Sequence, residues 1–170
     1  MSQTIPLPEF NVITIFQEDL HPYLIGGLQR IREAAFKFTN KPSVQCWNKD
    51  IDQSEDTIHY AIEIETRGEL VGSGRLQVKV GPDQGLASFS RIAIHPTHQG
   101  QGLGKAMIAH IISDVTRLAV SNNIPFQLTI EVRPHLVKFY SLRFGFEVTG
   151  HDGEYIIMDK TIEPTCRLHP

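Results

Sequence analysis

The stretch that decides the fold runs from Ser88 to Val120, SFSRIAIHPTHQGQGLGKAMIAHIISDVTRLAV. It opens with a β-branched apolar run that ends at His95-Pro96, because proline has no N–H for a sheet ladder. A glycine-rich segment follows. Beyond it, apolar residues recur every three or four positions, as on one face of a helix: Leu103, Met107, Ile108, Ile111, Ile112, Val115, Leu118 and Ala119. The pattern predicts a strand, a glycine loop and a helix, in that order.

The loop Gln99-Gly100-Gln101-Gly102-Leu103-Gly104 has the chemistry of an anion site. The first turn of a helix presents N–H groups without intrahelical partners, and the helix dipole adds partial positive charge there. Alternating glycines remove the Cβ atoms that would keep a ligand at a distance. We therefore expect a phosphate or pyrophosphate at this loop. The alternative is a flexible connection before an ordinary helix.

The same residues resemble the acetyl-CoA signature of the GNAT superfamily of N-acetyltransferases. The signature Q/R-x-x-G-x-G/A is matched at Gln99, Gly102 and Gly104. A second match follows in the expected order, at Glu131-Val132-Arg133, Phe139-Tyr140 and Gly145-Phe146. The resemblance covers the chain from Glu69 to Lys160.

Composition and charge exclude several classes of protein. The chain has 170 residues, 41% hydrophobic and 21% charged, which fits one globular domain spanning 1–170. We expect a core over 11–160 and flexible ends at 1–9 and 164–170. The net charge of −3, without a basic run, argues against nucleic acid or an anionic membrane as partner. No segment approaches the ~20 apolar residues of a membrane span.

Cysteine usage and the N-terminus predict a cytoplasmic protein. Cys46 and Cys166 lie far apart and fit no metal spacing, so free thiols in a reducing compartment are expected. The first residues lack the charged and apolar regions of a signal peptide. The scattered histidines form no ligand set, and we expect no metal.

The periodicities predict further elements. Strands are expected at 11–16, 58–66, 70–80, 127–132, 146–148 and 155–158, besides the one that ends at Ile94, and helices at 22–38 and 135–144. This order is that of an α/β (α+β) protein. The resemblance implies the GNAT fold, a mixed, mostly antiparallel sheet of about seven strands, flanked by helices and with splayed central strands.

The polar segment 40–57 contains Asp50, Asp52, Glu55 and Asp56 without the spacing of a Ca²⁺ loop. A plain solvated loop and a wall for cationic substrates are both open readings, and a metal site is disfavoured. The run from Arg32 through Asp52 to His59 resembles the ElaA-like branch of GNAT proteins.

The resemblance assigns roles to the central stretch. The backbone of Ile92 and Ile94 would contact pantetheine, and the amides of 101–105 would bind the pyrophosphate of acetyl-CoA. Gln99 would line the start of the loop, where many relatives have arginine. The implied cofactor-binding set is Ile92, Ala93, Ile94, Gln99, Gly100, Gln101, Gly102, Leu103, Gly104 and Lys105.

The resemblance also implies catalytic residues. Tyr140 matches the tyrosine that protonates the CoA sulfur, although it precedes Gly145 by one residue more than in the common pattern. The alternative for Tyr140 is packing in the core. Glu131 matches the glutamate of the L-E-V-R word in ribosomal-protein N-terminal acetyltransferases and is the candidate base. A salt bridge on the strand face is the alternative for Glu131, and His135 or a water chain could serve as base instead.

These expectations combine into a function. The chain is predicted to be an enzyme, an acetyl-CoA-dependent N-acetyltransferase in which a primary amine attacks the thioester directly in a ternary complex. The rival hypothesis is a CoA-binding or sensing module without transferase activity. The acceptor is left open between a small molecule and a protein N-terminus or lysine, and a homodimer is left open as well.

Overall fold

The computed structural model describes residues 9–37 and 46–165. Several sequence predictions concern residues outside these ranges. They are Cys166, most of the two ends expected to be flexible (1–8 and 166–170), and the last residue of the helix expected at 22–38. In the part of the chain that is described, no helix is long and apolar enough to cross a membrane.

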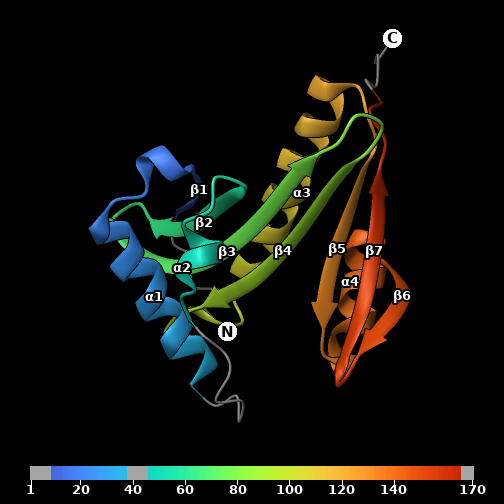
Figure 1. Ribbon diagram of the computed structural model, residues 1–170. Coiled ribbons are helices and arrows are strands. Elements are labelled where there is room, and N and C mark those ends of the chain that lie inside the picture. The colour runs from blue at the N-terminus through green and yellow to red at the C-terminus, as the bar shows by residue number, and fades with distance from the viewer. Residues whose placement is uncertain (1–8, 38–45, 166–170) are drawn as a thin grey trace. The chain divides into compact units, whose positions relative to one another are not determined.

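Seven strands form one mixed sheet in the order β1-β2-β3-β4-β5-β7-β6 (Figure 1). The pairs β1/β2, β5/β7 and β6/β7 are antiparallel, and β4/β5 is parallel. The strands are β1 (Phe10–Ile15), β2 (Thr57–Ile64), β3 (Glu69–Val80), β4 (Gly85–Ile94), β5 (Phe126–Val132), β6 (Glu147–Asp152) and β7 (Tyr155–Ile162). The helices are α1 (Pro22–Phe36), α2 (Lys49–Asp52), α3 (Leu103–Asn122) and α4 (Val137–Phe144), with 3-10 turns η1 (Gln17–Asp19), η2 (Pro96–His98) and η3 (Pro134–Leu136). The predicted fold class and element order are confirmed.

Two details differ from the sequence prediction. The segment without periodicity contains α2, a single turn whose N-cap Asn48 accepts a hydrogen bond from the Asp50 amide at 3.0 Å. The helix predicted from His135 begins instead as the turn η3, and α4 follows from Val137. Both elements are too short to show a helical period, so capping and turn residues are their only signal.

The chain divides into two compact units, which we describe separately. Unit 1 comprises Met1–Arg75 and Arg91–Ile108, and unit 2 comprises Leu76–Ser90 and Ala109–Pro170.

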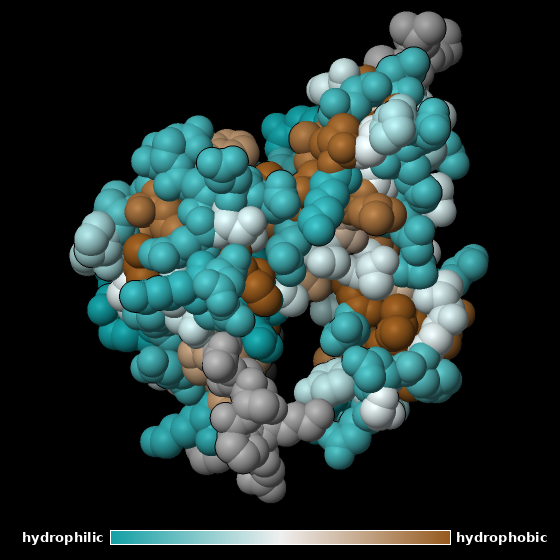
Figure 2. Space-filling view, in the orientation of Figure 1, coloured by the Kyte–Doolittle hydropathy of each residue, from teal (hydrophilic) through white to brown (hydrophobic). Residues whose placement is uncertain are grey.

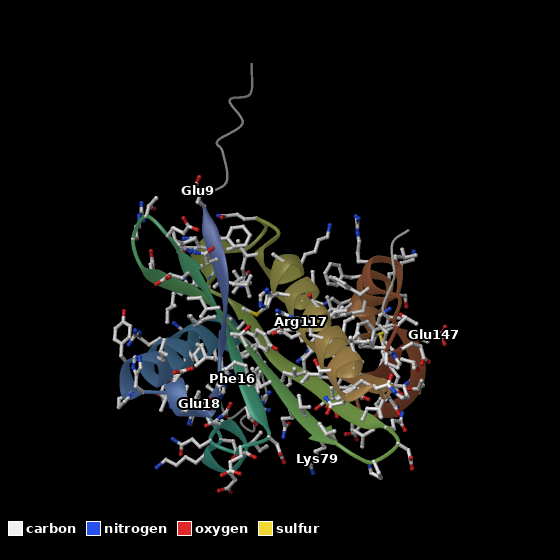
Figure 3. All side chains as sticks on the ribbon, turned by 90° about the horizontal axis from the view of Figure 1, so that it is seen from above. Glu9, Phe16, Glu18, Lys79, Arg117 and Glu147 are labelled. Atoms are coloured by element: carbon white, nitrogen blue, oxygen red, sulfur yellow. The ribbon has the colours of Figure 1, made fainter. Side chains whose placement is uncertain are left out.

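In unit 1, α1 packs against the first strands. Figure 3 labels Glu9 and Phe16, which flank β1, and Glu18 of η1, where the chain turns toward α1. Pro22 occupies the first turn of α1, where its missing N–H is harmless. A Cβ on Gly27 would lie 2.9 Å from Leu70 Cδ1, so this glycine allows α1 to approach β3 closely. The small core here contains the buried residues Ile15, Leu28 and Ala61, with Leu24 and Trp47 packed against them.

The two faces of β3 have different neighbours within unit 1. A Cβ on Gly74 would lie 2.8 Å from Met107 Sδ of α3 and 3.1 Å from Ile92 Cδ1. The preceding residue, Ser73, accepts a hydrogen bond from Arg32 Nε of α1 at 2.9 Å. Because successive strand residues point to opposite faces, the first turns of α3 cover one face and α1 covers the other.

In unit 2, β5 is paired along its whole length with β7, from Phe126↔Ile162 to Val132↔Ile156. Its parallel register with β4 is shorter and runs from Gly85↔Phe126 to Ser88↔Thr129. A side chain at Gly85 is excluded, because a Cβ would lie 2.4 Å from the Phe126 ring. Helix α4 ends at Gly145 in the left-handed conformation, with φ of 72°. The Gly145 amide donates to the Ser141 carbonyl, four residues back, which is the αL type of helix C-cap, and the Phe146 amide donates to the Tyr140 carbonyl.

Candidate functional site

The glycine loop between η2 and α3 forms an open surface of backbone. Gly100 and Gly102 have φ values of 77° and 79°, and a Cβ on either would meet no atom within 4 Å. A Cβ on Gly104 would meet only Ile94 Cγ1, at 3.7 Å. The fold around these positions therefore leaves room for side chains that are not there. The open space lies at the N-terminus of a 20-residue helix, where amides lack intrahelical acceptors.

The first turn of α3 contains one buried residue and one exposed cation. Leu103 is buried in the core and fixes the start of α3. Lys105 is exposed. A cation in the first turn is unfavourable beside the positive end of the helix dipole unless an anion binds nearby. The surroundings thus fit the pyrophosphate of acetyl-CoA.

Gln99 has a contact that the sequence did not reveal. Its Nε2 donates to the carbonyl oxygen of Ile94 at 3.0 Å and so ties the loop back to the end of β4. The Oε1 of Gln101 is buried and has no hydrogen-bond partner among the described residues. The loop therefore keeps one buried acceptor unsatisfied.

The end of β4 is held by β3 and by the core. The amide of His95 donates to the Val71 carbonyl at 2.8 Å. Ala93 is buried, while the side chains of Ile92 and Ile94 are half-buried. The predicted cofactor residues of β4 and of the loop thus all belong to unit 1, as neighbours along one segment.

Tyr140 and Glu131 belong to unit 2. The Tyr140 ring lies 6.2 Å from that of Phe89 and 5.9 Å from that of Phe146, measured between centroids. Its hydroxyl makes no hydrogen bond within the described ranges. Burial raises the pKa of Tyr140 to about 12. The hydroxyl is therefore protonated at neutral pH, as an acid or a hydrogen-bond donor must be.

Glu131 is exposed on β5, between the buried residues Ile130 and Val132 and opposite Ile157 of β7. His135, the other candidate base, is exposed in η3. Their solvent exposure is compatible with a base and equally with an ordinary strand-face or turn residue.

A second polar assembly in unit 1, which we call the Arg32 network, was not predicted, although Arg32, Asp52 and His59 belong to the run that resembles ElaA-like proteins. It consists of the buried side chains of Arg32, Asp52, His59, Ser73 and Arg75. Asp52 lies at its centre: Oδ1 pairs with Arg32 Nη1 at 2.9 Å and Oδ2 with Arg75 Nη1 at 3.1 Å. The Asn48 amide also donates to Oδ2, at 2.7 Å. Neither a solvated loop nor a wall for cationic substrates describes Asp52, because its charge is used internally by two arginines.

The histidine of this network is neutral. Its Nε2 lies 2.7 Å from the Asp52 carbonyl oxygen and must donate, so Nδ1, 3.3 Å from Arg32 Nη2, accepts. Burial lowers the pKa of His59 to about 4. The ring also stacks on Trp47, with centroids 5.2 Å apart.

Burial and pairing act in opposite directions on the charged members. Burial lowers the pKa of Arg32, and Asp52 offsets only part of this effect. For Asp52, burial would raise the pKa, but the Asn48 amide and the two arginines outweigh it, so the pKa is lowered. Over the ranges described, no group of three or more His, Cys, Asp or Glu side chains could hold a metal ion.

Comparisons with known proteins agree with this architecture. No curated protein sequence matches the chain significantly. Among solved structures, an acyl-CoA N-acyltransferase from Pseudomonas aeruginosa is similar with a TM-score of 0.73 and 22% identity, covering 89% of this chain and 99% of that one. Escherichia coli ElaA is similar with a TM-score of 0.69, 22% identity and the same coverages.

The ribosomal-protein-S18-alanine N-acetyltransferase of Escherichia coli gives a TM-score of 0.63 at 20% identity, over 95% of this chain and 99% of that one. At these identities the likeness shows the fold. The family model of the acetyltransferase (GNAT) domain matches residues 27–155, which include the loop, Glu131 and Tyr140. The chain therefore belongs to the GNAT family of acetyltransferases and is an acyltransferase enzyme.

Proposed function

We propose that this protein is an acetyl-CoA-dependent N-acetyltransferase that acetylates a primary amine by direct attack in a ternary complex. The observation that carries the proposal is the open backbone at Gly100, Gly102 and Gly104, at the start of α3. Its amides and the helix dipole suit a pyrophosphate. A content of two cysteines in 170 residues suits a reducing cytoplasm.

In this proposal the residues of unit 1 bind and orient the cofactor. The amides of 101–105 bind the pyrophosphate, and Gln99 keeps the loop at its angle to β4 through the Ile94 carbonyl. Main-chain groups of Ile92, Ala93 and Ile94 hold the pantetheine arm. Orientation of the thioester in this way supplies much of the rate enhancement in two-substrate reactions.

Transfer joins the amine nitrogen to the acetyl carbon and breaks the carbon–sulfur bond. The nitrogen loses a proton to a base. We propose Glu131 as this base, with His135 or a water chain as the alternatives. The sulfur leaves as a thiolate and gains a proton, for which we propose Tyr140.

The pKa of Tyr140 refines this role. At about 12 it exceeds the ~8.5 of an ordinary thiol by roughly 3.5 units, so complete transfer to a free thiolate is uphill. Tyr140 therefore stabilises the departing sulfur by a hydrogen bond while the carbon–sulfur bond breaks, and a proton that Tyr140 gives to the sulfur is replaced from solvent.

A panel assay separates this proposal from a CoA-binding module. Wild-type protein is mixed with acetyl-CoA and a set of primary amines, and thiol release is followed together with the mass of the acetylated product. Turnover with any amine supports the enzyme. Micromolar CoA binding by calorimetry without turnover on any amine favours the binding module.

Tyr140→Phe tests the catalytic assignment. The ring still packs, so the free energy of unfolding should change by ~1 kcal/mol or less. A lost proton donor should lower kcat about 10²–10⁴-fold with little change in KM for acetyl-CoA. Phe139→Leu, at the neighbouring ring, is the packing control. A kcat within about twofold of wild type would make Tyr140 a core residue only.

A further inference from the structure

Arg91 has an unusual backbone conformation. Its φ is 57°, in the left-handed region, although it lies inside β4. Within the described ranges the only other non-glycine residue with positive φ is Asn123, directly after α3, where asparagine commonly terminates a helix. An arginine in this conformation is strained, and such strain persists where the surrounding structure enforces it, often at functional sites.

The side chain of Arg91 has an unused donor. The Nε atom is buried and has no hydrogen-bond partner among the residues that the structure describes. No carboxylate of those residues forms an ion pair with Arg91. A buried N–H without an acceptor is rare in folded proteins, because its loss of water is not compensated.

The surroundings of Arg91 carry surplus positive charge. Arg91 lies close enough to lower the pKa of both Arg32 and Arg75. Asp52 is the one carboxylate of the Arg32 network and pairs with Arg32 and Arg75, and His59 is neutral, so Arg91 adds a further positive charge beside this network. Glu33, which acts on the neighbouring Cys46, is exposed to solvent.

Arg91 and its neighbour Ile92 act on different residues of unit 1. The next residue, Ile92, points toward Gly74 and α3. The charge of Arg91 instead acts on Arg32 of α1 and on Arg75. Arg91 thus adds positive charge near Arg32 and Arg75, in the strand whose backbone we assign to pantetheine.

We propose that the acceptor amine carries a carboxylate, as a free amino acid does, and that Arg91 binds this carboxylate. This inference rests on the proposed function, because it concerns the acceptor of the same reaction. The guanidinium edge formed by Nε and one Nη matches the two oxygens of a carboxylate. The Arg32 network contributes by holding further positive charge near the anion. The phosphates of CoA share this anionic chemistry, so the test includes them.

The test compares amino acids with the amines that remain when the α-carboxylate is removed: lysine with cadaverine, histidine with histamine, tyrosine with tyramine, tryptophan with tryptamine. Wild-type protein should acetylate at least one amino acid with a kcat/KM at least ~10-fold above that of its amine partner. In Arg91→Gln this value should fall ~10- to 100-fold, mainly through KM, while the amine partner changes less than about twofold. Arg91→Lys should retain part of the preference. Arg67→Gln, an exposed arginine of the same unit, is the charge-matched control.

Binding is measured without transfer as well. In the absence of acetyl-CoA, the preferred amino acid should raise the thermal midpoint of the wild type and of Arg67→Gln, and should not raise that of Arg91→Gln. Calorimetry with CoA should give the same Kd for all three proteins. A lower CoA affinity in Arg91→Gln with an unchanged amino acid preference would assign the anion to a CoA phosphate and overturn the proposal.

The remaining outcomes distinguish a failure of the Arg91 carboxylate site from a failure of the proposed acetyltransferase activity. Turnover that favours the decarboxylated amines, or an equal loss on both members of a pair, overturns the role of Arg91 and leaves the acetyltransferase standing. Amino acid binding that depends on Arg91, without any turnover, supports the carboxylate site and overturns the transferase. No turnover and no Arg91-dependent shift in thermal midpoint overturn both.

Discussion

The glycine loop and the Arg32 network are two polar regions of the same unit with opposite designs. The loop presents backbone amides around positions where a Cβ would meet almost nothing. The network buries side chains that satisfy one another, with Asp52 bonded to Arg32, Arg75 and the Asn48 amide. The glycine loop comes from one short segment and leaves its amides open to a ligand. The Arg32 network brings together distant segments, and its buried side chains stabilise the fold.

The largest expected effect comes from breaking the network. Asp52→Ala leaves two buried arginines without their carboxylate and should lower the free energy of unfolding by about 3–5 kcal/mol. Urea unfolding measures the loss, with Asp50→Ala, an exposed acid of the same turn, as control. Asp52→Asn keeps the shape and removes only the charge. A loss below ~1 kcal/mol in both Asp52 variants would contradict a stabilising role.

The second effect is a pH dependence at His59. Its pKa in the folded protein, about 4, lies below the ordinary 6.5, so its contribution to stability is present above pH 6.5 and is lost as the pH falls toward 4. The size of this contribution is about 3 kcal/mol at ~1.4 kcal/mol per unit. In His59→Gln the free energy of unfolding should fall less over this range than in wild type or in the exposed variant His135→Gln. If the free energy of unfolding depended equally on pH in wild type, His59→Gln and His135→Gln, His59 would not be buried as a neutral ring.

A smaller effect tests how the loop is held. Gln99→Ala removes the bond to the Ile94 carbonyl and should raise the Kd for acetyl-CoA about 2- to 10-fold, the usual range for one neutral hydrogen bond. Stability should change little, because Gln99 is exposed. Gln53→Ala, an exposed glutamine outside the loop, is the control. An affinity equal to the control's would leave Gln99 without a role in binding.

The smallest effect is expected from metal removal. Transfer requires no Lewis acid in the proposed function, so EDTA should leave the rate within about twofold. Activity lost with EDTA and restored by a divalent cation would contradict this.

The contrast between the two regions also explains what the sequence could predict. The strand ending at Ile94, the loop and α3 follow from local patterns, because periodicity and glycine spacing report on neighbouring residues. On the face visible in Figure 2, hydrophilic residues cover most of the surface, with hydrophobic residues between them. The family resemblance, which the family-model match over 27–155 confirms, rests on short sequence motifs of the same local kind.

The Arg32 network had no such signal. Arg32 is separated from Asp52 by 20 residues, from His59 by 27 and from Ser73 by 41. An arginine on a helix and an aspartate in an irregular segment are usually solvated, and only their burial reveals the pairing. Arg91 was missed for a similar reason, since strand periodicity does not predict a left-handed residue inside β4.

The most direct test of the loop assignment is calorimetric titration of acetyl-CoA into Gly104→Val and Gly104→Ala. A side chain at Gly104 is not strained and has room in the fold, so both variants should unfold within about 1 kcal/mol of wild type. Valine crowds the amides that bind the pyrophosphate, and the Kd should rise at least ~30-fold, whereas alanine, which the family signature allows, should raise it only a few-fold. Wild-type affinity in Gly104→Val would contradict the assignment of this loop to acetyl-CoA.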